Sequence, residues 1–285
     1  ADVHFVGKEI VRFHSIIWPA MLMSLNLPLP KKVYGHGWLL LDGGKMSKSK
    51  GNVVDPYVLA QRFGVDALRF FLLRTFPFGS DGNFSNEALI STINVDLAND
   101  LGNLVSRTVA MAQKYFGEHL PAEQAADAEK DSELLAMVSS LREKYEEQME
   151  KFAFQNALGE IFKVISRANK YIDENAPWVL AKDEAQKPRL ARVLYNLLET
   201  VRICGGLLEP FMPDTSAEIA KRLGGADMTW ESLNVFGTLS REVAAVAGPA
   251  LFPRIDMEKE LKELEELNKP ALPPLEIEPY TEENV

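Results

Sequence analysis

The chain has 285 residues, 46% of them hydrophobic and 25% charged, which is enough apolar material for the cores of two globular domains. No run approaches the roughly 18 uncharged apolar residues of a membrane-spanning helix, so no membrane partner is expected. The single Cys204 excludes an internal disulfide and fits a reducing cytoplasm, and the four scattered histidines leave no zinc-ligand spacing.

The net charge of −10 argues against a nucleic-acid partner, but the charge is unevenly distributed. Residues 1–78 carry ten Lys/Arg and five Asp/Glu, whereas acid is concentrated in 118–133 and 254–285. Charge alone therefore does not settle whether nucleic acid is bound.

The first elements predict one crossover of a parallel α/β sheet. His4 to Val6 ends a buried strand, residues 33–41 form a second apolar strand, and a helix lies between them. That helix carries one stripe at helical spacing, formed by Ile10, Phe13, His14, Ile17 and Trp18.

The chain after residue 54 is predicted to be helical. Asp55 followed by Pro56 begins a helix that ends at Gly64, and Asp66 is expected to cap the next one. Ser85 begins a long amphipathic helix to about residue 116, and further helices are predicted near 133–150, 153–174, 187–208, 214–223 and 258–268. The second half is thus predicted to be an all-α bundle followed by a Pro- and Glu-rich linker.

The run from Gly44 to Asn52 combines lysines and serines between glycines. Composition alone allows a solvated loop, but the same groups would clamp a polyphosphate through ammonium, hydroxyl and backbone donors. A Walker-type P-loop is excluded, because position 39 is Leu and Met46 follows Lys45.

Within this run, Lys45, Met46, Ser47, Lys48 and Ser49 resemble, residue for residue, the lysine loop of class I aminoacyl-tRNA synthetases. The resemblance implies that the five residues bind ATP, with Mg²⁺ as its companion ion. It also implies that Lys45 and Lys48 act catalytically, by stabilising the departing pyrophosphate.

The order Gly7 to His14 followed by Trp18 to Ala20 is similar to the methionine-pocket stretch of methionyl-tRNA synthetases. The resemblance implies that Ile10, Phe13 and His14 border the methionine side chain, whereas their periodicity alone would fit plain core positions. Apolar and aromatic surface suits a polarizable sulfur.

Three further positions resemble the nucleotide side of the same family. His36 and Gly37 match its adenosine-contacting pair, and Glu9 stands where the family commonly has Asp near the ribose. The extra methylene of Glu9 is a departure that leaves its direct contact with the 2′-hydroxyl open.

Asn103, Arg107 and Trp178, which follows Pro177, match in spacing and neighbours the anticodon-reading residues of methionyl-tRNA synthetases. Taken alone, an Asn/Arg pair on a helix is usually surface and a Trp after Pro is usually core. Asn and Arg can read base edges, and Trp can stack on an unpaired base.

The resemblance thus predicts a Rossmann-type α/β half domain (1–86), an all-α anticodon-binding bundle (87–236), and a tail and linker (237–285), whose tail packs back toward the catalytic half. It implies a cytoplasmic methionine-tRNA ligase with methionine, ATP and tRNA-Met as partners. The family's upstream His-Ile-Gly-His type signature and its connective domain do not occur in the chain. A missing N-terminal half is therefore expected as a partner, and the fragment alone is expected to be inactive.

Two alternatives remain. The chain could act as a non-catalytic tRNA-binding module or as one half of a split enzyme. Another class I synthetase, such as the leucine, isoleucine or valine enzyme, shares the lysine loop but would carry a different anticodon domain.

Overall fold

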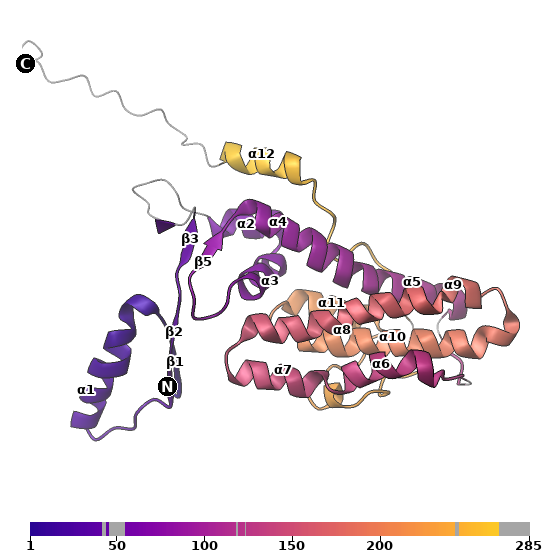
Figure 1. The fold of residues 1–285 in the computed structure, drawn as a ribbon, viewed down its shortest axis with the longest axis horizontal. Coiled ribbons are helices and arrows are strands. Elements are labelled where there is room, and N and C mark those ends of the chain that lie inside the picture. Colours follow the sequence, from indigo (N-terminus) through magenta and orange to yellow (C-terminus); the bar gives the residue numbers. More distant parts are fainter. Residues whose placement is uncertain (42–43, 46–54, 118, 123, 243–244, 268–285) are drawn as a thin grey trace, which may run out of the picture.

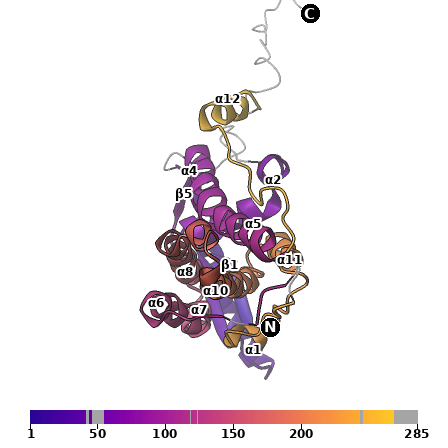
Figure 2. The same ribbon diagram turned by 90° about the vertical axis from the view of Figure 1, so that its right-hand side faces the viewer.

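A computed structural model describes residues 1–41, 44–45, 55–117, 119–122, 124–242 and 245–267. A small α/β part lies at one end and a long helical bundle at the other (Figure 1), and Figure 2 looks along the bundle from its far end. The strands β1 (Val3–Gly7) and β2 (Lys32–His36) pair in parallel, and the helical segments η1 (Lys8–Ile10), η2 (Phe13–Ile17) and α1 (Trp18–Ser24) connect them. The predicted order of a strand, a helical crossover and a parallel strand is confirmed.

The prediction of one continuous strand over 33–41 is wrong. After β2 the chain crosses to a second sheet, in which β3 (Leu39–Leu41) pairs antiparallel with β4 (Gly44–Lys45) and parallel with β5 (Gly82–Phe84). A Cβ on Gly37 would lie 2.0 Å from the carbonyl oxygen of Ser80, so only glycine admits this close approach. Strand propensity alone could not show that a distant turn packs against this point.

The prediction that Asp66 caps its own helix is also wrong. The helix α2 (Pro56–Phe63) is capped by Asp55 as expected, but Asp66 lies inside the first turn of α3 (Val65–Thr75). Its Oδ2 accepts hydrogen bonds from the backbone N and the Oγ1 of Thr215, both at 2.7 Å, at the start of α11 (Pro213–Arg222). Asp66 therefore caps a helix 149 residues away and fastens α3 to the bundle.

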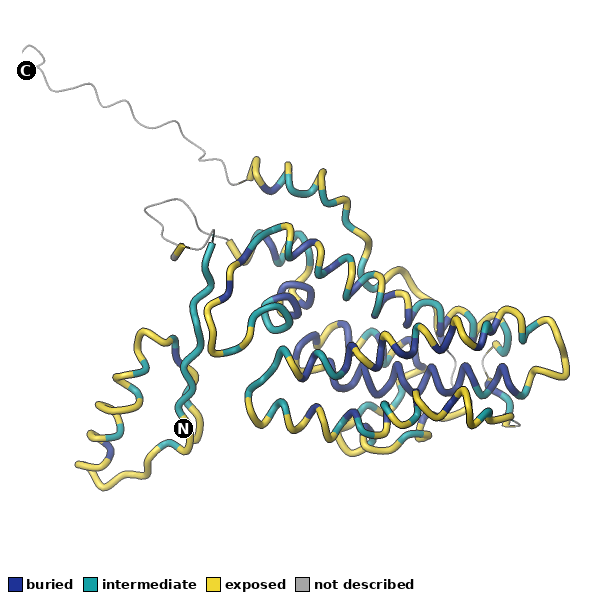
Figure 3. The backbone as a smooth tube through the Cα atoms, viewed as in Figure 1, coloured by how far each residue is buried: buried dark blue, intermediate teal, exposed yellow. Residues whose placement is uncertain are grey.

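One long helical rod joins the two parts of the molecule. It consists of α4 (Asn86–Thr92), the π-helical η4 (Ile93–Gly102) and α5 (Asn103–Phe116), and the Ser85 side chain caps its start. The remaining bundle helices are α6 (Ala128–Ser139), α7 (Leu141–Glu150), α8 (Phe154–Asn175), α9 (Pro177–Leu180) and α10 (Lys187–Leu207), with short 3₁₀ turns η5 (Glu184–Gln186) and η6 (Ser232–Asn234). The helix α10 is almost wholly buried at the centre (Figure 3), so the predicted all-α bundle is confirmed.

The tail returns to the α/β part, as predicted. The side chain of Asn94 holds the backbone of Ile255 from both sides, donating to its oxygen at 2.9 Å and accepting from its nitrogen at 2.8 Å. The following helix α12 (Met257–Leu267) packs on α4, and Arg62 of α2 bonds to its Glu260 and Glu263. Among the helices described here, none is both long and apolar enough to cross a bilayer.

Candidate functional site

The candidate nucleotide residues meet at the carboxyl ends of two parallel strands. Gly7 and His36 are paired in the sheet, so Glu9, just beyond β1, and Gly37, just beyond β2, lie at one edge. The Oε2 of Glu9 accepts a hydrogen bond from Trp38 Nε1 at 2.8 Å. Ligands of open parallel sheets bind at this kind of edge.

A cluster that was not predicted from the sequence orients these groups. Lys8 Nζ contacts both carboxylate oxygens of Asp81 at 2.5 and 2.6 Å and lies 4.1 Å from the centroid of the Trp38 ring. Asp81 also accepts from the backbone N of Trp38 at 2.8 Å. Trp38 is thereby fixed, and it in turn holds the carboxylate of Glu9. Asp81 lies 73 residues from Lys8, so no local sequence pattern indicates the cluster.

The lysine-loop residues are only partly within the described structure. Lys45 lies in β4 with its backbone paired to Leu40. Met46, Ser47, Lys48 and Ser49 lie outside the described residues. The described chain resumes at Asp55, which caps α2 through its hydrogen bond from the backbone N of Tyr57 at 2.8 Å.

The candidate methionine-pocket residues lie together on η1 and η2. Nδ1 of His14 is 3.1 Å from the carbonyl oxygen of Ile10, and the His14 ring meets the ring of His4 edge-on with centroids 5.8 Å apart. Ile10 is 39% exposed and Phe13 48% exposed, so the described residues do not enclose them.

The same segment presents a broad apolar face to solvent. Its exposed members include Ile16, Ile17, Trp18, Met21 and Met23. Contiguous exposed apolar surface of this kind marks an interaction site in most proteins. Of the stripe expected from the sequence, Ile10, Phe13, Ile17 and Trp18 are exposed, and they lie on 3₁₀, π-helical and α-helical turns in succession rather than on one α-helix.

The three candidate anticodon residues lie on the bundle. Arg107 of α5 and Trp178 of α9 line one groove of about 390 Å³. Asn103 is exposed at the first residue of α5, one turn before Arg107. The structure thus brings Arg107 and Trp178 into one groove, with Asn103 on the adjoining turn of the same helix.

Arg107 is held by a partner that was not predicted from the sequence. Its Nη2 donates to Oδ1 of Asp173 on α8 at 2.9 Å. Asp173 is 67% exposed, so water and salt screen this pair, and it contributes little to stability. The two residues are 66 positions apart, which again leaves no local signal.

Trp178 is presented by a sharp break between two helices. The helix α8 ends at Asn175, Ala176 adopts a left-handed conformation with φ of 42°, and Pro177 begins α9. Proline is well suited to a first helical position, because it has no N–H to leave unpaired. Trp178 follows with 43% of its surface exposed.

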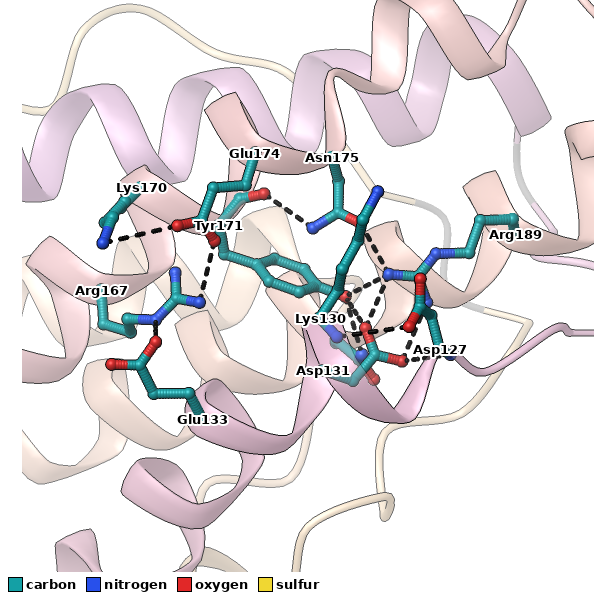
Figure 4. Close-up of polar contacts among 11 residues, drawn as sticks. Asp127, Lys130, Asp131, Glu133, Arg167, Lys170, Tyr171, Glu174, Asn175 and Arg189 are labelled. Atoms are coloured by element: carbon teal, nitrogen blue, oxygen red, sulfur yellow. Dashed lines mark hydrogen bonds and ion pairs between the residues drawn. The ribbon is translucent and has the colours of Figure 1, made fainter.

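A buried polar network anchors the end of α8 beneath this break (Figure 4). Arg189 donates to both oxygens of Asp131, at 2.8 and 2.7 Å, and to Oδ1 of Asn175 at 2.6 Å. The hydroxyl of Tyr171 donates to Asp131 at 2.6 Å and accepts from Nδ2 of Asn196 at 3.1 Å. Because Asn175 directly precedes the left-handed residue, the network fixes the point from which Trp178 projects.

The network also determines the ionisation states of Asp131 and Tyr171. Burial raises the pKa of Asp131, but hydrogen bonds from Arg189 and Tyr171 outweigh it and leave the pKa below its ordinary value. Burial, followed by the bond to Asp131, raises the pKa of Tyr171. Asp131 is therefore a carboxylate and Tyr171 a neutral phenol at neutral pH.

Comparisons with known proteins match both parts of the chain. The family described as "tRNA synthetases class I (M)" matches residues 1–109, and the "Anticodon binding domain of methionyl tRNA ligase" matches residues 120–266. The methionine–tRNA ligase of Caldanaerobacter subterraneus subsp. tengcongensis is 62% identical over 93% of the chain, and that of Clostridium perfringens is 54% identical over all of it.

Solved structures agree with these matches. Mycobacterium tuberculosis methionyl-tRNA synthetase bound by methionyl-adenylate superposes with a TM-score of 0.83 and 41% identity, over 89% of this chain and 50% of that one. The chain spans 42–43% of the length of the two curated relatives it matches above. The chain thus belongs to the methionyl-tRNA synthetase family.

Proposed function

We propose that the chain is the lysine-loop and anticodon-binding portion of a methionine-tRNA ligase, which activates methionine with ATP and transfers it to tRNA-Met. The observation that carries the proposal is the match to a methionine–tRNA ligase over 93% of the chain, which includes both the α/β part and the bundle, at 62% identity. A different class I synthetase would share the lysine loop but not the bundle.

In this proposal the α/β part supplies one side of the adenylation site. Glu9, His36 and Gly37 at the sheet edge would face the adenosine, and Lys45 and Lys48, with Met46, Ser47 and Ser49, would contact the polyphosphate. Positive charge aimed at a leaving pyrophosphate stabilises the transition state more than the ground state.

Mg²⁺ would reach this site on the phosphates of ATP. Among the described residues, no group of three or more His, Cys, Asp or Glu side chains could hold a metal ion.

Methionine would lie against Ile10, Phe13 and His14. These side chains offer the apolar and aromatic surface that suits a thioether, with one imidazole beside it. Their present exposure fits a pocket whose other wall comes from elsewhere in the enzyme.

The missing N-terminal half of the enzyme is proposed as the partner that supplies that wall. The curated relatives are more than twice as long as the chain, and the exposed apolar face of η2 and α1 offers a surface for it to cover. Without it the chain would bind tRNA but would not form the adenylate.

The bundle would read the anticodon through Asn103, Arg107 and Trp178. Trp178 offers an exposed ring on which an unpaired base can stack, and Arg107 and Asn103 offer donors for base edges. The proposed domain limits remain 1–86, 87–236 and 237–285, and a role in translation places the enzyme in the cytoplasm.

ATP–pyrophosphate exchange with each amino acid tests the proposal. The longer protein that contains this chain should exchange with methionine alone, and the 285-residue chain should not exchange at all. Lys48→Ala should slow exchange by about 10²–10³-fold while methionine binding changes little. Lys144→Ala, at an exposed lysine of α7, is the control. Exchange driven by leucine, isoleucine or valine would show that the amino-acid assignment is wrong.

A further inference from the structure

The groove beside Trp178 is lined by more residues than those singled out from the sequence. They are Arg107, Ala110, Met111, Lys114 and Tyr115 from α5, together with Trp178 from α9. The five α5 residues recur at spacings of three and four, so they share one face of that helix. The lining contains two cations and two aromatic rings but no carboxylate. Grooves that hold single-stranded nucleic acid combine these same elements.

The two cations of the groove differ in how they are held. Arg107 forms an ion pair with Asp173 at 2.9 Å. To bind a base edge, its guanidinium must either use its remaining N–H groups or break this ion pair. Lys114 is exposed, and within the described part of the chain it makes no ion pair. As far as the described residues show, its ammonium is available to an anion without first breaking a salt bridge.

Tyr115 holds Lys114 beside the groove. The Lys114 ammonium lies 5.3 Å from the centroid of the Tyr115 ring, within the range of a cation–π contact. Tyr115 itself is partly buried and packs against the bundle core, so its ring is a fixed support. An otherwise flexible lysine thus has a preferred position at one end of the groove.

The two cations lie on the same face of α5, two helical turns apart. Lys114 is seven positions after Arg107, which is about 10 Å along a helix axis. A nucleotide whose base stacks on Trp178 and whose edge meets Arg107 would place its phosphate toward Lys114. We propose that Lys114 is a phosphate-binding residue of the anticodon groove and that Tyr115 is its positioning residue. The inference rests on the proposed anticodon-binding function.

Binding of the 285-residue chain to two transcripts tests it, one tRNA bearing CAU and the same tRNA with a changed anticodon. Lys114→Gln should weaken both complexes alike, by about fourfold near 0.15 M salt. The reason is that the affinity supplied by one phosphate contact falls with roughly the 0.7 power of the salt concentration. The slope of log K against log salt should fall by about 0.7, and the preference for CAU should remain. Lys144→Gln, on α7 away from the groove (Figure 1), should change neither quantity.

Tyr115 is tested by a matched pair of variants. Tyr115→Phe keeps the ring and should bind like the parent chain, whereas Tyr115→Leu should lose part of the Lys114 contribution and of the salt slope. A purely structural tyrosine would lower the melting temperature without changing that slope.

The outcomes separate this inference from the proposed function. If Lys114→Gln binds both transcripts like the parent chain while Trp178→Ala loses the CAU preference, the lysine assignment is wrong and the function stands. Selective loss of CAU binding in Lys114→Gln would make the lysine a base reader and would also overturn the assignment. If the parent chain shows no CAU preference, the proposed function fails, and any effect of Lys114 is then a nonspecific RNA contact.

Discussion

Replacing Asp131 should lower the stability of the bundle more than replacing any exposed acidic residue. Asp131 is 3% exposed and accepts hydrogen bonds from Arg189 and Tyr171. Asp131→Ala leaves the Arg189 guanidinium, which is only 10% exposed, with no carboxylate beside it. An uncompensated buried charge costs about 3–5 kcal/mol, a large part of the roughly 5–15 kcal/mol that stabilises a typical domain.

Urea unfolding followed by circular dichroism measures this cost directly. The single variants Asp131→Ala and Arg189→Met should each lower the free energy of unfolding by about 3–5 kcal/mol. The double variant Asp131→Leu with Arg189→Met removes both charges and should recover most of the loss, because well-packed apolar residues can replace a buried ion pair.

The pH dependence gives a second measure of the same contact. The pKa of Asp131 is lowered in the folded protein, so its contribution is present above the ordinary carboxyl pKa of about 3.9. The contribution is lost as the pH falls through the lower folded value. Asp131→Asn should remove this part of the acid-induced loss of stability. A single-variant cost below about 1 kcal/mol, or an unchanged acid transition, would refute the role given to the network.

Three further perturbations follow from the packing. Asp66→Ala removes the cap on Thr215 and should lower the free energy of unfolding by about 1–2 kcal/mol, measured in urea; an unchanged midpoint would contradict the cap. Gly37→Ala should lower the melting temperature, since its Cβ would overlap the backbone of Ser80 in the facing turn. An unchanged melting temperature would show that this turn can shift to accommodate the methyl group. Asp173→Asn frees Arg107 and should tighten binding of the CAU tRNA, measured by fluorescence titration, while weaker binding would mean that the pair orients the arginine.

Much of the fold could be predicted from the sequence, because local signals agree with the final packing. The helix from Ser85 to Phe116 shows one apolar face and a capping serine, and both features are present in the structure. Asp55 followed by Pro56 likewise marks the start of α2. These features depend on residues within one or two helical turns of each other, so they can be recognised in a single sequence.

The errors arise where distant segments decide the local structure. Asp66 has the residue type of a helix cap, but it lies inside the first turn of α3 and its partner is Thr215 in another helix. The break in the 33–41 strand depends on the turn at Ser80 that packs on Gly37. No property of the residues adjacent in sequence reveals either contact.

The same distinction applies to the candidate site. The candidate site residues are indicated by a resemblance, since helical spacing alone does not distinguish Arg107 from any surface arginine. Lys114 and Tyr115 could be recognised from the sequence, because they continue the Arg107 face of α5 by two turns. Asp173 and Asp81 could not, because each reaches its partner only through the tertiary fold.

The proposed reading of a methionine anticodon by Trp178 is tested most directly by one binding measurement. The affinity of the chain is measured for a tRNA bearing CAU and for the same tRNA with a changed anticodon, in the parent chain, in Trp178→Ala and in Trp230→Ala. Trp230 is the matched control, being 40% exposed against 43% for Trp178 but lying beside Tyr145 on α7. The parent chain and Trp230→Ala should prefer CAU, and Trp178→Ala should lose about 1–3 kcal/mol, roughly 5- to 150-fold, for the CAU tRNA alone. A Trp178→Ala chain that melts earlier but keeps its preference for CAU would contradict the claim.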